Sequence, residues 1–92
     1  MHALDATLTE QLRVAAREVL ATRPGIALDL PGIRRRIDQD KLVEFAYTNV
    51  ELRGTMTLLL DLGQITLIHG TLGATEYFRA TAAGMLAFER GQ

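Results

Sequence analysis

Three consecutive arginines, Arg34–Arg36, form the only concentrated positive charge in this sequence of 92 residues. Guanidinium groups donate paired hydrogen bonds to phosphate oxygens, so these three side chains and that of Arg79 are candidate phosphate contacts on a nucleic acid. The imidazole of His69 is a further candidate phosphate contact. Four carboxylates lie close to the arginines in the sequence and would weaken their positive field: Asp29, Asp38, Asp40 and Glu44. A phosphate-binding surface and an ordinary solvent-exposed charged face therefore both fit this segment.

Residues 49–62 carry a second set of candidate side chains. Arginine is the side chain that most often contacts guanine, so Arg53 is a candidate for reading a base. Asn49 and Thr57 carry groups that can donate a hydrogen bond to a base or to a phosphate. A solvated or ion-paired arginine is the ordinary alternative for Arg53. We expect Asn49, Arg53 and Thr57 to contact DNA if this segment enters a groove.

The same segment also fits a protein surface. Val50 and Leu58 are apolar, and they fall on the same helix face as Arg53 if the opposite face is buried. Asp61 lies on that face too, where its carboxylate would repel a phosphate backbone. Val50 and Leu58 are therefore the candidate contacts of an alternative protein interface.

The sequence predicts neither an enzyme nor a protein with a cofactor or a bound metal. It has no cysteine, which excludes disulfides, thiolate metal ligands and a cysteine nucleophile. His2 and His69 lie in unlike contexts, no His-x-x-x-His motif occurs, and the glycines do not form a phosphate-cradling loop. Asp38 and Asp40 are paired by spacing, yet they lie beside arginines near an expected helix end, where solvated charge is the ordinary explanation.

Length and composition favour one small globular domain over residues 1–92. Apolar residues make up 48% of the chain, and 10 basic against 11 acidic residues leave a net charge of -1. A DNA-binding domain usually has an excess of positive charge, so any basic surface here must be local. No leader or membrane-spanning segment is apparent, and we expect a cytoplasmic protein.

A helix over residues 49–62 is predicted to run directly into a strand. Thr48 and Glu51 have the spacing of a capping box at its start. Its apolar residues recur at helical spacing: Leu52, Met56, Leu59 and Leu60. Gly63 is placed to end the helix, and the β-rich residues 64–68 follow at once.

Helical periodicity predicts further helices over residues 4–22, over about two turns after Asp29, and over residues 82–90. In the first of these, Arg13 and Arg17 are expected to face solvent. In the last, three apolar side chains are expected to face the core: Met85, Leu86 and Phe88.

The connections are less regular. Residues 26–28 are just long enough to add a short piece to the edge of a small sheet, and residues 75–80 form a strand after a glycine-containing loop. Residues 39–47 fit two interpretations, an extended connection or a continuation of the second helix. The extended interpretation, which we place first, follows from the alternation of Val43, Phe45 and Tyr47.

The run Leu59–Ile65, a glycine-containing loop and the run Tyr77–Gly84 together resemble the end of bacterial winged helix-turn-helix domains of the MarR, PadR or ArsR kind. The chain is also similar to small winged-helix proteins of bacterial genomes and prophages. The likeness extends over residues 48–91, and over residues 5–38 through element order alone. It implies an α+β fold with a three-helix core, a two-stranded wing with a short third strand, and a C-terminal helix.

In such domains the third helix enters the major groove and the wing contacts the DNA backbone or minor groove. The resemblance thus implies a transcription regulator that binds duplex DNA through helix 49–62 and wing 64–80. The first and last helices would form a homodimer, or would only complete the core of one copy. The competing hypothesis is a protein-interaction or dimerisation module that does not bind DNA. The thiolate ligands of the metal-sensing ArsR kind have no counterpart here.

Overall fold

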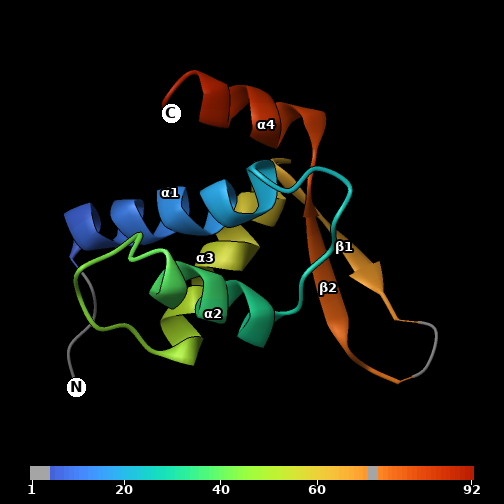
Figure 1. Ribbon diagram of the computed structural model, residues 1–92, viewed down its shortest axis with the longest axis horizontal. Coiled ribbons are helices and arrows are strands. Elements are labelled where there is room, and N and C mark those ends of the chain that lie inside the picture. The colour runs from blue at the N-terminus through green and yellow to red at the C-terminus, as the bar shows by residue number, and fades with distance from the viewer. Residues whose placement is uncertain (1–4, 71–72) are drawn as a thin grey trace.

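Six elements follow one another in the computed structural model, which describes residues 5–70 and 73–92. They are α1 (Ala6–Ala21), α2 (Leu30–Gln39), α3 (Asn49–Asp61), β1 (Ile65–His69), β2 (Glu76–Ala80) and α4 (Ala82–Glu89) (Figure 1). The described residues are thus α+β, with four helices and one two-stranded antiparallel sheet, as the sequence predicts. His2, the expected helix start at residue 4, and loop residues 71 and 72 lie outside the described residues.

The predicted capping box starts α3. The Glu51 amide donates to the Thr48 hydroxyl oxygen over 3.1 Å, and the Thr48 amide donates to the Glu51 carboxylate over 2.8 Å. At the other end Gly63 has a φ of 71°, the left-handed conformation that favours glycine. The amides of Gly63 and Gln64 donate back to the carbonyls of Leu60 and Leu59, both over 3.0 Å. This Schellman motif satisfies the last helical carbonyls and turns the chain directly into β1.

Helix α2 begins and ends through local chemistry. Asp29 accepts a hydrogen bond of 2.9 Å from the Gly32 amide, and Pro31 lies in the first turn, where no amide donor is needed. The helix ends at Gln39, and Lys41 takes a left-handed φ of 52°. Residues 42–48 are neither helix nor strand, with a bend at residues 44–45, so α2 does not continue through this connection.

The sheet is a hairpin with one added contact. β1 and β2 pair antiparallel with Ile65 opposite Ala80 and His69 opposite Glu76. Leu28 adds a single bridge to Phe78, with backbone hydrogen bonds of 2.9 and 2.8 Å. The short piece predicted at residues 26–28 is therefore present as this one bridge.

Helix α1 lies between the other helices and supplies much of the core, packing on α2, α3 and α4 (Figure 1). The core is formed mainly by fully buried residues of the first three helices: Leu12, Ala16, Val19, Leu20, Ile33, Ile37, Leu52, Met56 and Leu59. The alanine-rich face of α1, with Ala15 and Ala16, is buried inside this one chain.

The expectation that Arg17 faces solvent is wrong, because this residue is only 1% exposed. Its Nη1 donates to the Gln64 side-chain oxygen over 3.1 Å, while its Nε has no partner among the described residues. Burial lowers the pKa of Arg17, and the neighbouring positive charge of Arg13 lowers it further. Because other helices cover α1 on several sides, its buried face is wider than a single apolar stripe.

Helix α4 packs through small residues, which corrects the prediction for Leu86. Leu86 is 45% exposed, and the buried positions are Gly84 and Ala87. A Cβ added at Gly84 would overlap the carbonyl oxygen of Gln64 and lie 2.9 Å from its carbonyl carbon. The helix thus approaches the α3–β1 turn too closely for a larger side chain.

Within the described ranges, no helix combines the length and the apolar character that a membrane span needs.

Candidate nucleic-acid interface

Arg34 joins α2 to the start of α3. Its Nη1 donates to the Asn49 side-chain oxygen over 3.0 Å, and its Nη2 donates to the Tyr47 carbonyl oxygen over 3.0 Å. The guanidinium carbon also lies 4.4 Å from the centre of the Tyr47 ring, which is a cation–π distance. Arg34 therefore holds the first turn of α3 in a fixed orientation relative to α2.

Tyr47 extends this network back to α2. Tyr47 is 7% exposed, and its hydroxyl donates to the Asp38 carboxylate over 3.1 Å. Burial raises the pKa of Tyr47 to about 12, and the hydrogen bond to Asp38 raises it as well. Arg34 and Asp38 are one helical turn apart on α2, so together they hold both ends of this tyrosine.

The ionisation of Tyr47 is expected to weaken the fold above about pH 10. The unfolded tyrosine ionises near its ordinary pKa of 10.0, whereas the folded one stays neutral until about 12. Stability that is complete below pH 10 is therefore lost as the pH rises, by about 1 kcal/mol at about pH 11. Urea unfolding at about pH 9 and about pH 11 should show a larger loss for the wild type than for Tyr47→Phe. Equal losses in the two proteins would contradict this assignment.

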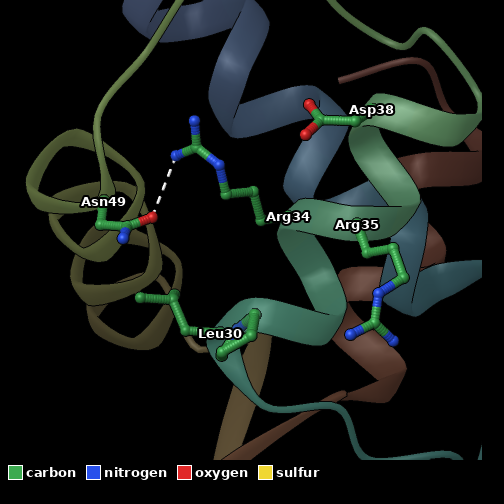
Figure 2. A pocket seen from close by; sticks show the side chains of 6 residues that line it. Leu30, Arg34, Arg35, Asp38 and Asn49 are labelled. Carbon is green, nitrogen blue, oxygen red and sulfur yellow. Dashed lines mark hydrogen bonds between the residues drawn. The ribbon is translucent and has the colours of Figure 1, made fainter.

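An open hollow of about 330 Å³ lies between α2 and the start of α3. It is lined by Leu30, Pro31, Arg34, Arg35, Asp38 and Asn49. Figure 2 shows Arg34 reaching toward Asn49, while Arg35 points away from it. Arg35 and Arg36 are exposed and form no hydrogen bond or ion pair with the described residues. The three arginines thus differ, since one is structural and two have free guanidinium groups.

The outward face of α3 is as predicted. The exposed residues include Val50, Arg53, Gly54, Thr57, Leu58 and Asp61. Arg53 lies 3.3 Å from Glu76 at the start of β2, an exposed ion pair of small energy. The Thr57 hydroxyl donates to the Arg53 carbonyl over 3.1 Å. Both polar candidates of this face therefore have a contact within the chain as well as access to solvent.

The two hairpin candidates lie on separate strands. His69 is the exposed last residue of β1 and faces Glu76, and Arg79 is an exposed residue of β2 opposite Thr66. Arg79 has no hydrogen bond or ion pair within the described part of the chain. The structure therefore brings Arg34 to Asn49 and Arg53 to Glu76, and it leaves Arg35, Arg36 and Arg79 free.

The network of Asp38, Tyr47, Arg34 and Asn49 is the feature that sequence reasoning missed. Its one local signal is the turn spacing of Arg34 and Asp38, since the tyrosine and asparagine come from beyond the connection. In the ranges that the structure covers, no three His, Cys, Asp or Glu side chains gather as metal ligands would.

The fold and this site define a small α+β domain whose α2–α3 pair carries free arginines. No protein-family model matches the chain, and the search of curated proteins gives no match either.

Proposed function

We propose that this chain is a winged helix-turn-helix domain that binds duplex DNA. The element order supports this proposal, because α2 and α3 follow α1 and the bridging residue Leu28, and the β1–β2 hairpin has the place of a wing. In this arrangement α3 enters the major groove, and α2 and the hairpin lie against the phosphates.

The proposal depends mainly on two α2 guanidinium groups, those of Arg35 and Arg36, that have no partner among the described residues. Arg35 and Arg36 are free, whereas three of the four neighbouring carboxylates are engaged elsewhere: Asp29 caps α2, Asp38 accepts from Tyr47, and Asp40 lies 3.7 Å from Arg23. The fourth, Glu44, is exposed, and none of these carboxylates forms an ion pair with Arg35 or Arg36. The two guanidinium groups can therefore meet phosphates without first breaking an ion pair.

Two matched variants test this surface. Arg35→Ala combined with Arg36→Ala should weaken binding to a random-sequence duplex about tenfold or more at low salt, because two phosphate contacts are lost. The control combines Arg90→Ala at the end of α4 with Lys41→Ala just after the end of α2, and it removes the same charge from two exposed positions outside the α2–α3 hollow. Fluorescence anisotropy measures both affinities. Equal weakening in both variants would mean that net charge alone acts, and would contradict a surface on α2.

As a regulator, the domain would bind as a homodimer, because two copies match the two halves of a twofold-symmetric DNA site. With Ala15 and Ala16 already buried, Leu86 of α4 is the large apolar side chain of α1 and α4, as the structure describes them, that is most exposed for such a contact.

A second candidate function is protein binding through α3. Its exposed apolar side chains favour this: Val50 is 82% exposed, Leu58 39% and Leu62 50%. Under this alternative, Leu58→Asp abolishes association with a second copy or a partner, and the wild-type chain has no affinity for DNA. Analytical ultracentrifugation of the wild type and of Leu58→Asp measures the association with a second copy.

A further inference from the structure

We infer that Arg34 is a positioning residue that orients the side-chain NH₂ donor of Asn49 toward a phosphate oxygen of duplex DNA. This inference rests on the proposed function and names the role of one residue pair within it. The pair lies at the α2–α3 hollow, where Arg34 reaches across to the first residue of α3 (Figure 2).

The direction of the Asn49 side chain follows from the chemistry of its partner. A guanidinium has only donors, so the Asn49 atom 3.0 Å from Arg34 Nη1 must be the carbonyl oxygen. The side-chain nitrogen of Asn49 therefore points away from Arg34, and no described residue accepts a hydrogen bond from it. Asn49 is exposed, so this NH₂ group faces solvent.

Two further contacts keep Arg34 in this position. Its Nη2 donates to the Tyr47 carbonyl oxygen, and its guanidinium carbon lies over the Tyr47 ring. Tyr47 is itself buried, and its hydroxyl donates to Asp38. Asn49 therefore has its donor group oriented before any ligand arrives. Such preorganisation lowers the entropy lost on binding.

The same geometry disfavours one way of reading bases. Recognition of adenine by asparagine needs the carbonyl oxygen and the NH₂ group together. Arg34 already donates to one lone pair of the Asn49 carbonyl oxygen, so a base donor would share this oxygen with a guanidinium, whereas the NH₂ group has no competing partner among the described residues. The positive charge of Arg34 itself lies beside Asn49, and the free Arg35 lines the same hollow although its guanidinium points away from Asn49 (Figure 2). These charges favour an anionic oxygen there, so the group that fits is a phosphate of the DNA backbone.

The first test needs no DNA. NMR relaxation of the Asn49 side-chain NH₂ group should give a clearly lower order parameter in Arg34→Met than in the wild type. Arg35→Met, one position along, removes the same charge without touching Asn49 and should leave the order parameter unchanged. If Arg34→Met leaves Asn49 equally ordered, Arg34 is not its positioning residue.

The second test measures binding to a random-sequence duplex. Asn49→Ala should weaken binding about three- to tenfold, the usual worth of one hydrogen bond, without changing the salt dependence, because a neutral donor releases no counterion. Asn49→Asp keeps the acceptor for Arg34 but has no donor and adds a negative charge, so it should bind more weakly still. Arg34→Met and Asn49→Ala combined should cost less than the sum of the two single changes.

Each other outcome has a definite meaning. If sequencing of the bound duplexes shows a changed base preference in Asn49→Ala, the contact is to a base and the phosphate assignment is wrong. If Asn49→Ala binds as the wild type does while the Arg35 and Arg36 variant is weakened, this inference fails and the proposed function stands. If the wild type binds no DNA, both fail, and the order parameters still report whether Arg34 holds Asn49.

Discussion

Gly84→Ala is expected to destabilise the protein by about 3 kcal/mol or more, because the new Cβ would overlap the Gln64 carbonyl oxygen. That oxygen belongs to the backbone and accepts a hydrogen bond of 3.1 Å from the Thr81 amide, so it cannot turn aside as a side chain would. Helix α4 must therefore move away from the α3–β1 turn. Urea unfolding followed by circular dichroism measures the loss.

Gly54→Ala is the matched control for this prediction. Gly54 lies on the exposed face of α3, and a Cβ there would meet no atom within 4 Å. Alanine favours the helix more than glycine, so Gly54→Ala should stabilise the protein by up to about 1 kcal/mol. Equal stabilities for Gly84→Ala and the wild type would contradict the close approach of α4.

Gln64→Leu is expected to destabilise the protein by about 2 to 3 kcal/mol. The Gln64 side chain accepts the one hydrogen bond that the buried Arg17 guanidinium makes among the described residues. Without it a buried positive charge has lost its partner, which costs more than the hydrogen bond itself contributes. The change is measured by the same unfolding experiment.

A double variant separates this cause from a loss of packing. Arg17→Met combined with Gln64→Leu removes the charge together with its partner, and it should recover most of the stability that Gln64→Leu loses. A double variant less stable than Gln64→Leu would show that the guanidinium contributes through packing, and would contradict the explanation by an unpaired charge.

Local signals predicted most of the helix boundaries. The capping box of Thr48 and Glu51 and the turn at Gly63 depend on residues within a few positions of each other, so they can be recognised before any tertiary structure is known. Burial on α1 and α4 could not be predicted in the same way. Arg17 is covered and Leu86 is exposed because of how close other elements approach, which depends on long-range packing.

The candidate site shows the same division. The outward face of α3 follows from helical periodicity, and its residues are exposed as predicted. The sequence alone does not distinguish the three consecutive arginines of α2 from one another. Arg34 differs only because α3 lies beside it, and its partner Asn49 is 15 residues away along the chain. Local sequence therefore indicated where the positive charge lies, but not which guanidinium groups are free to bind a ligand.

Binding of the wild-type chain to a random-sequence duplex across a range of salt concentrations tests the proposed function most directly. With Arg35, Arg36 and Arg79 free to meet phosphates, the logarithm of the association constant should fall against the logarithm of salt concentration with a slope of about -2 or steeper. Absence of binding at the lowest salt, by protein shown to be folded, would contradict DNA binding and leave the protein interface on α3 as the better account.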